Sequence, residues 1–187
     1  FNKMYINIIF IVYLLFSNSF SREYVLLVSF DGFRYDYPTI IDTPNFDKIE
    51  ERGVKAKSLI PIFPTLTFPN HYSIATGCYA DKHRIISNTF YSKTLNRLYS
   101  MHDRETVIDT AFYGAEPIWV TAEKNGLKSA SYFWVGSEAS ERTPSIYKNY
   151  DSGIAFTSRI DSVVSWFNLP KNKRPNFNLT GVSVVFA

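Results

Sequence analysis

The stretch "EYVLLVSFDG", residues 23–32, contains a continuous apolar run that stops at Asp31-Gly32. A short run of this kind, ended by a turn signal, is typical of a strand buried on both faces of a parallel sheet. We therefore predict a buried strand over these residues. The carboxylate of Asp31 then lies at the carboxyl end of that strand.

Helix and strand signals alternate along the chain that follows this strand. The segment "TPNFDKIEERG", residues 43–53, predicts a short helix, with Thr43 as cap, Pro44 in the first turn and Gly53 as stop. The segment 156–167 predicts an amphipathic helix, because its apolar residues recur at helical spacing: Ile160, Val163, Val164 and Phe167. The other predicted elements are strands over 54–63 and 127–135 and helices over 70–77 and 116–126.

This alternation predicts an α/β fold, with a mostly parallel sheet flanked by helices on both faces. Ligands bind at the carboxyl ends of the strands in such sheets. Asp31 and the stretch from Thr65 to Thr67 both follow predicted strands. We therefore expect them to share one site.

The first 21 residues differ from the rest of the chain. They carry a single charge, Lys3, then an apolar run from Ile6 to Phe16, and they end in Ser19-Phe20-Ser21. The run is about half the ~20 residues needed to span a bilayer. This pattern favours a secretory signal peptide over a membrane anchor or a buried strand, and predicts a secreted protein or one on the extracellular face of the membrane.

Composition limits the other function classes. The formal net charge is +3, and the sequence contains no dense run of Lys and Arg, so binding to a nucleic-acid polymer is not expected. Cys78 is the only cysteine and gives no disulfide framework. Asn178-Leu179-Thr180 forms a glycosylation sequon, which is consistent with export.

Two residues have both a structural and a chemical interpretation. Asp31 is either a turn residue or a metal ligand. Thr67, in "FPTLTFPNHYSIATG" (63–77), is either an ordinary helix N-cap or a nucleophile held where a helix N-terminus receives a phosphate. A threonine hydroxyl needs activation, for example by a divalent metal, to act as a nucleophile at neutral pH. Thr65 competes for the same role.

Other candidate residues are equally open when each is considered alone. The Asn88 amide is either a donor to a developing oxyanion or a turn former. Phe68, Trp134 and Tyr150 form either an aromatic slot for a base or part of the core. The three histidines show no paired ligand spacing and are more typical of structural residues than of zinc ligands: His71, His83 and His102.

Five segments together resemble the nucleotide pyrophosphatase/phosphodiesterase family of the alkaline phosphatase superfamily. They occur in the family's order and near its spacing over about residues 24–177: "VLLVSFDGFRYDY", "TPNFDKIEERGVKA", "PTLTFPNHYSIATGCYADKHRIISNTFY", "EPIWVTAEKNGLKSASYFWVGSE" and "FTSRIDSVVSWFNLPKNKRPNF". The resemblance implies a secreted hydrolase that cleaves phosphodiester or pyrophosphate bonds of nucleotides, or of related phospholipid-type diesters. Binding to a nucleic-acid polymer or to a stable protein partner is not expected.

The resemblance also implies a role for each candidate residue. Asp31 would ligate one of two zinc ions, and Thr67 would contact the same zinc and form a phospho-threonine intermediate. Thr65 matches a neighbouring position that is not the nucleophile. Asn88 would bind a non-bridging phosphate oxygen. Phe68 and Tyr150 would sandwich the substrate base, and Trp134, which lies in the family's F-W-P-G-S stretch, would also belong to the substrate site.

The sequence departs from the family pattern in two places. Val135 replaces the proline of the family's F-W-P-G-S stretch, which makes the substrate preference harder to infer. After Phe177 the chain ends in "NLTGVSVVFA", without the family's later aspartate and histidine ligands. The expected organisation is a signal peptide (1–21), the N-terminal portion of the catalytic domain (22–177) and a divergent tail (178–187).

We therefore expect an inactive fragment of a larger enzyme. Two alternatives are a phosphomonoesterase or sulfatase of the same superfamily, which the T-F-P-N-H string disfavours, and a non-catalytic secreted binding protein that keeps the aromatic slot. Zinc content would separate the enzyme from the binding protein.

Overall fold

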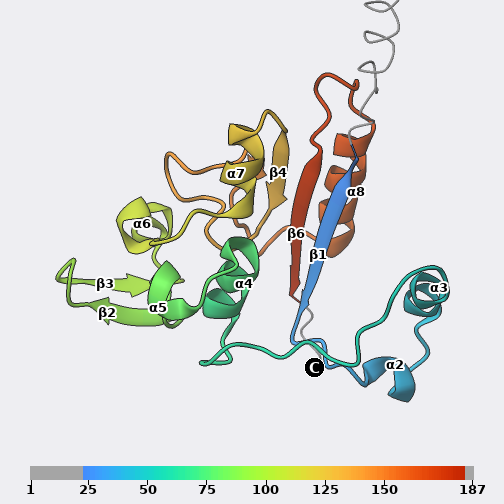
Figure 1. Cartoon of the computed structure of the whole chain (residues 1–187), viewed down its shortest axis with the longest axis horizontal. Helices are drawn as coiled ribbons and strands as arrows, with labels where there is room; N and C mark the ends of the chain where they lie inside the picture. The colour runs from blue at the N-terminus through green and yellow to red at the C-terminus, as the bar shows by residue number, and fades with distance from the viewer. Residues whose placement is uncertain (1–22, 184–187) are drawn as a thin grey trace, which may run out of the picture.

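The main sheet has four parallel strands with flanking helices, which confirms the predicted fold class (Figure 1). The computed structural model describes residues 23–183. Along the sheet the strands follow the order β1-β6-β4-β5. Their bounds are Val25–Asp31 for β1, Ser129–Tyr132 for β4, Ile146–Lys148 for β5 and Phe177–Ser183 for β6.

Helices cover the middle of this sheet on both faces. On one face lie α4 (Thr67–Thr76) and α7 (Ile118–Lys124). On the other lies α8 (Phe156–Phe167), which packs Val163 and Trp166 against β4. Smaller elements complete the described chain: α2 (Tyr37–Ile40), α3 (Pro44–Arg52), α5 (Ala80–His83), the antiparallel hairpin of β2 (Thr89–Ser92) and β3 (Arg97–Ser100), α6 (Arg104–Ile108), and a 3-10 turn at Thr110–Phe112.

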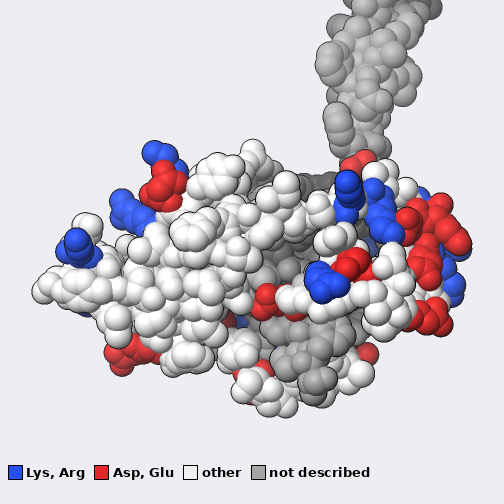
Figure 2. Space-filling model, turned by 90° about the horizontal axis from the view of Figure 1, so that it is seen from below, with Lys and Arg blue, Asp and Glu red and all other residues white. Residues whose placement is uncertain are grey.

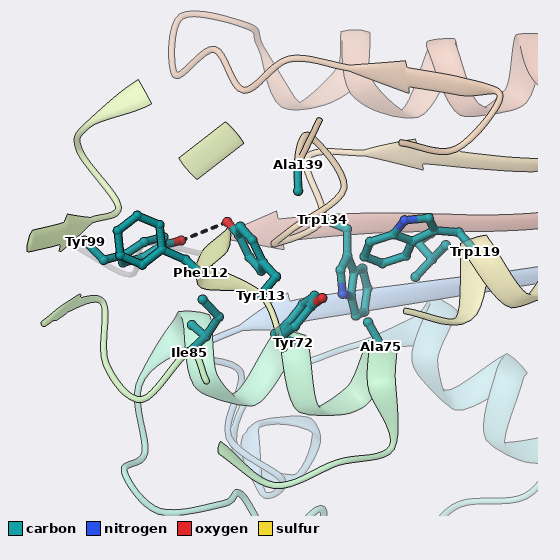
Figure 3. Close-up of a cluster of buried hydrophobic side chains, with 10 residues drawn as sticks. Tyr72, Ala75, Ile85, Tyr99, Phe112, Tyr113, Trp119, Trp134 and Ala139 are labelled. Atoms are coloured by element: carbon teal, nitrogen blue, oxygen red, sulfur yellow. Dashed lines mark hydrogen bonds between the residues drawn. The ribbon is translucent and has the colours of Figure 1, made fainter. Parts of the chain in front are cut away.

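The core on the α4 face is built mainly from aromatic side chains (Figure 3). The Trp134 indole is 2% exposed and donates from Nε1 to the carbonyl oxygen of His71, at 3.0 Å. The hydroxyls of Tyr99 and Tyr113 lie 3.0 Å apart in a hydrogen bond. Burial raises the pKa of Tyr72 to about 12, so this phenol is neutral at physiological pH. This core joins α4 to the loop that follows β4.

Helix α3 confirms the predicted bounds, since it runs from Pro44 to Arg52 between Thr43 and Gly53, but the Thr43 side chain makes no capping bond to the backbone and donates to Asp47 Oδ1 at 3.3 Å. Helix α8 has the predicted bounds, but its buried side chains are Val163 and Trp166, whereas Ile160 and Val164 are each 52% exposed. The buried stripe is displaced because Trp166 packs against Tyr132.

The strand predicted at 54–63 is wrong. These residues form an irregular connection between α3 and α4, in which Val54, Leu59 and Ile60 are at least 80% exposed. An apolar run forms a strand only where a neighbouring backbone satisfies its hydrogen bonds, and within residues 23–183 no strand pairs with this segment.

Strand β1 is confirmed, but it is not buried on both faces. Leu27, Ser29 and Asp31 point toward the α4 side, whereas Leu26 and Phe30 are at least 36% exposed. The reason is positional, since β1 is the last strand at one side of the described sheet and α8 packs against the inner strands.

The expected tail boundary after Phe177 falls inside strand β6, which pairs with both β1 and β4. Asn178 lies in this strand and is 0% exposed, so the sequon is inaccessible in the folded chain.

The expected signal peptide at 1–21 lies outside the described residues. Within residues 23–183, no helix combines the length and the apolar character needed to cross a bilayer.

Gly136 is required where the loop after β4 meets α4. Its φ is +82°, and a Cβ there would lie 2.6 Å from Cε2 of Tyr72. We expect Gly136→Ala to lower the free energy of unfolding by roughly 2–5 kcal/mol, from left-handed strain plus overpacking. Gly77→Ala is the matched control, because Gly77 has a φ of +65° and open space around its Cβ position. Equal losses in urea unfolding of the two variants would contradict the steric explanation.

His83 makes the stability of the protein depend on pH. Burial lowers its pKa below the ordinary value, and its ring nitrogens bond Ser73 Oγ and the Ile85 N–H. The unfolded chain therefore takes up this proton at a higher pH than the folded chain, and stability falls as pH drops below about 6.5. We expect His83→Gln to reduce the slope of unfolding free energy against pH between about 6.5 and 5. His102 is exposed, so His102→Gln is the control. An equal reduction of the slope in that variant would contradict the assignment to His83.

Candidate active site

Asp31 and Thr67, the two strongest candidates for a chemical role, meet where β1 ends and α4 begins. Thr67 is the first residue of α4, and its Oγ1 donates to Asp31 Oδ2 at 3.1 Å. The N-cap is Leu66, so the Thr67 hydroxyl does not cap the helix. The structure therefore leaves this hydroxyl paired with a carboxylate at a strand end. Thr65 is exposed and forms no such pair in the described chain.

The backbone before Thr67 is held in place by Asn70. The Nδ2 group of Asn70 donates to the carbonyl oxygens of Pro64 and Leu66, at 3.1 and 2.8 Å. Its Oδ1 accepts from the Ile62 N–H at 2.8 Å. One side chain thus fixes the path of the chain into the helix. The sequence analysis missed this role, although the position of Asn70 in the first turn after Thr67 was a signal for it.

His71 supports the same corner from inside. Nδ1 lies 2.8 Å from the carbonyl oxygen of Thr67, and Nε2 lies 2.8 Å from Ser29 Oγ. A carbonyl only accepts, so Nδ1 carries the proton and Nε2 accepts from Ser29. His71 therefore ties the turn that carries Thr67 to the strand that carries Asp31. Both ring nitrogens are used, which agrees with the structural interpretation of this histidine.

Asn88 lies beside the first turn of α4. Its Oδ1 accepts from the Phe68 N–H at 3.0 Å. Because the oxygen end of the amide is engaged, the Nδ2 end provides the donors for a ligand. In the same turn Pro69 has no N–H, and the Asn70 N–H bonds Leu66. Within the described residues, the Thr67 N–H is thus the remaining donor of this helix start.

A cavity of about 440 Å³ opens beside this pair. Its lining includes all of the predicted site residues except Asn88, which bonds the Phe68 N–H: Asp31, Thr67, Phe68, Trp134 and Tyr150. The lining also includes residues that the sequence analysis did not select, among them Phe133, Arg104 and Glu138. Asp31 and Thr67 also border a second cavity, of about 450 Å³, between β1 and the segment before α4.

The three predicted aromatic residues have different surroundings. Phe68 is partly buried and packs against the core, and Tyr150 is 61% exposed. The Tyr150 ring lies 5.2 Å from the Phe133 ring, centroid to centroid. Trp134 also contributes to the cavity lining, but its indole is 2% exposed and lies in the aromatic core beside α4 (Figure 3). Its part in substrate binding stays a prediction.

Two of the described residues would serve as ligands of the zinc ion that the sequence resemblance implies. Asp31 Oδ2 and Thr67 Oγ1 are two oxygen donors in contact, which fits one side of a coordination shell. Within residues 23–183, no group of three His, Cys, Asp or Glu side chains lies close enough to hold a metal. Zinc usually takes four ligands, so these two oxygens alone do not fit a complete site.

Charge on the surface is mixed in sign. On the face shown in Figure 2, basic and acidic side chains lie near one another in small groups. Two such pairs belong to the region of α2 and α3, Arg34 with Asp36 and Lys55 with Glu50. These exposed pairs contribute little to stability.

The family model "Type I phosphodiesterase / nucleotide pyrophosphatase" matches residues 25–184. Venom phosphodiesterase CdcPDE of Crotalus durissus collilineatus is 44% identical over 162 residues, which are 84% of this chain and 19% of that protein. Ectonucleotide pyrophosphatase/phosphodiesterase family member 3 of Rattus norvegicus is 41% identical over 162 residues, 84% of this chain and 18% of that protein.

Solved structures of an ectonucleotide pyrophosphatase/phosphodiesterase also match this chain. Murine ectonucleotide pyrophosphatase/phosphodiesterase 5 superimposes with a TM-score of 0.80 at 32% identity, over 86% of this chain and 43% of that chain. A second structure of that murine protein is an inactive threonine-to-alanine variant in complex with AMP, with a TM-score of 0.80 at 31% identity. The chain spans about a fifth of the length of the curated Crotalus and Rattus relatives.

Asn88 provides a test of how the helix start is held. We expect Asn88→Ala to lower the free energy of unfolding by about 1 kcal/mol, because the Phe68 N–H loses its acceptor. Asn88→Asp keeps that acceptor and should unfold within about 0.5 kcal/mol of the wild type in urea titrations. A larger loss for the aspartate variant than for the alanine variant would contradict the bond to Phe68.

Proposed function

Because the chain belongs to the type I phosphodiesterase/nucleotide pyrophosphatase family, we propose that the protein carrying it hydrolyses phosphodiester or pyrophosphate bonds of extracellular nucleotides, or of related phospholipid-type diesters. The observation that carries the proposal is the Thr67 hydroxyl, at a helix start and hydrogen-bonded to Asp31. Thr67 is the nucleophile in this proposal. A murine relative supports the choice of a threonine, since its threonine-to-alanine variant is inactive and was solved in complex with AMP.

The reaction has two steps, both at phosphorus. In the first step Thr67 Oγ1 loses its proton and forms a bond to phosphorus while the bond to the leaving oxygen breaks; the leaving group departs with that proton, and the phosphoryl group stays on Thr67 as a phospho-threonine. Water then attacks the same phosphorus and releases Thr67 and a phosphate monoester. In the resting structure Asp31 Oδ2 accepts a hydrogen bond from the Thr67 hydroxyl, and so holds the nucleophile in one orientation.

Other residues of the chain bind and orient the phosphate in this proposal. The Thr67 N–H and the positive end of α4 attract an anion. The Asn88 Nδ2 group donates to a non-bridging oxygen, since its Oδ1 is fixed on Phe68. The base enters the cavity that Phe68 and Tyr150 help to line. Stacking on such rings is tolerant of base identity.

Two zinc ions complete the proposed site. A bound zinc ion lowers the pKa of a hydroxyl and neutralises charge on phosphoryl oxygens. Asp31 and Thr67 would hold one of these ions, together with ligands from outside the described residues. We therefore propose that the 187-residue chain alone is inactive and that the larger protein acts outside the cell after export by residues 1–21.

A second candidate is a non-catalytic secreted binding protein with the same fold. The observation that favours it is the incomplete metal-ligand set in residues 23–183. Zinc content of the purified intact protein separates the two candidates. About two zinc ions per chain support the enzyme, and the binding protein needs none.

Thr67 and Thr65 form a matched pair for testing the nucleophile. We expect Thr67→Ala to lower the turnover of a p-nitrophenyl nucleoside phosphodiester by a factor of about 10³ or more in the intact protein. Thr65→Ala should keep turnover near the wild-type value, because Thr65 does not contact Asp31 in the described chain. Similar losses in the two variants, or turnover by Thr67→Ala near the wild-type rate, would contradict the proposal.

A further inference from the structure

We propose that Glu138 is a positioning residue of the cavity: together with Arg104 it fixes the backbone of Tyr150, and so the wall that Tyr150 forms. The inference rests on the proposed function, because it assumes that a nucleotide base binds in this cavity. Glu138 does not need to touch the ligand for this role. It acts through Tyr150.

The Glu138 carboxylate joins three separate segments of the chain. Its side chain is 5% exposed, and Oε1 accepts from the Tyr150 N–H at 2.9 Å. Oε2 forms an ion pair with Nη1 of Arg104, at the start of α6. Nη2 of Arg104 in turn donates to Asn149 Oδ1 at 3.0 Å. Two consecutive residues, Asn149 and Tyr150, are therefore held by one ion pair.

Glu138 itself is held rigidly. Gly136, two residues earlier, packs directly on the Tyr72 ring, where a Cβ would lie 2.6 Å from Cε2. The Ser137 hydroxyl is 0% exposed, accepts from Ser131 Oγ at 2.7 Å and donates to the Trp134 carbonyl oxygen at 2.8 Å. The backbone on which Glu138 stands is thus fixed to both the core and strand β4. It is a firm base for a contact to a more exposed segment.

Few other contacts in the described chain restrain Tyr150. It follows β5, a strand of three residues at one side of the described sheet, and its side chain is 61% exposed. Its ring contacts the Phe133 ring at 5.2 Å between centroids. A loop residue with so few buried contacts opens at low free energy unless its backbone is bonded. The hydrogen bond to Glu138 supplies this restraint.

The chemistry of the contact explains why a charged pair is suited to it. A carboxylate forms a stronger hydrogen bond to a backbone N–H than a neutral acceptor does. A carboxylate this deeply buried needs a compensating charge, which Arg104 supplies while 46% of its own side chain stays exposed. An ordered wall lowers the entropy cost of closing the cavity around a base. Fixing Tyr150 in advance therefore improves binding of an aromatic ligand, without a direct contact from Glu138.

The test measures two ligands in the intact protein, AMP and ribose 5-phosphate, which lacks the base. We expect Glu138→Ala to weaken AMP binding about tenfold in calorimetry, the cost of one lost buried hydrogen bond, with ribose 5-phosphate affected less than about twofold. Glu138→Gln keeps an acceptor for Tyr150 and should restore most of the AMP affinity. Thermal unfolding of both variants checks that the fold is retained.

Two further measurements separate positioning from a general structural role. Hydrogen exchange should show a protected Tyr150 amide in the wild type and in Glu138→Gln, and loss of protection in Glu138→Ala. In the background of Tyr150→Ala, Glu138→Ala should cause no additional loss of AMP affinity, because the two residues act as one unit.

Several results would overturn the assignment. Protection of the Tyr150 amide in Glu138→Ala, equal weakening of both ligands, or additive losses in the double variant each contradict the positioning role. Failure of the wild-type protein to bind AMP contradicts the proposed function instead. The exchange experiment uses no ligand, so it distinguishes the failure of one from the failure of the other.

Discussion

The hydrogen bond from Thr67 to Asp31 joins two segments that lie 36 residues apart, and the rest of the site is arranged around it. It forms because α4 begins where β1 ends. His71 bonds the Thr67 carbonyl on one side and Ser29 on the other, which locks the helix start to the strand. Asn70 fixes the chain that enters the helix. The position of the hydroxyl is thus set by buried contacts and not by the loop alone.

The aromatic core explains why this arrangement is rigid. The Trp134 indole donates to the His71 carbonyl, and Gly136 packs on Tyr72, so the loop after β4 is bound to the same helix that carries Thr67. The floor of the cavity and the proposed nucleophile therefore belong to one packed unit. The more exposed wall, at Tyr150, is attached to this unit through Glu138. A rigid floor together with a wall that hydrogen bonds hold in place keeps the cavity preorganised for a ligand.

Strand β1 and the segment 54–63 expose apolar side chains. Leu26, Phe30 and Leu59 are exposed, and Asp31 and Thr67 also border a cavity on that side. The chain spans 43% of the murine structure that it matches. The metal site therefore depends, in our proposal, on ligands from outside the described residues.

The sequence by itself determined the features that depend on local chemistry. The stop at Asp31-Gly32, the cap and stop of α3 and the periodicity of α8 predicted these three elements, because turns, caps and amphipathic stripes are encoded by neighbouring residues. The meeting of Asp31 with the Thr67 stretch was also expected, but from a strand at 54–63 that the structure does not contain; Thr67 reaches Asp31 as the first residue of α4.

Only the tertiary structure decided the features that depend on partners distant in the chain. The apolar segment 54–63 has no neighbouring strand within the described residues, and is therefore a connection. Asn178 is buried because β6 lies between β1 and β4. Two aromatic residues with similar sequence signals, Trp134 and Tyr150, ended in the core and at the surface. The ion pair of Glu138 and Arg104 depends on the packing of separate elements, and no local pattern specifies which distant side chains packing brings into contact.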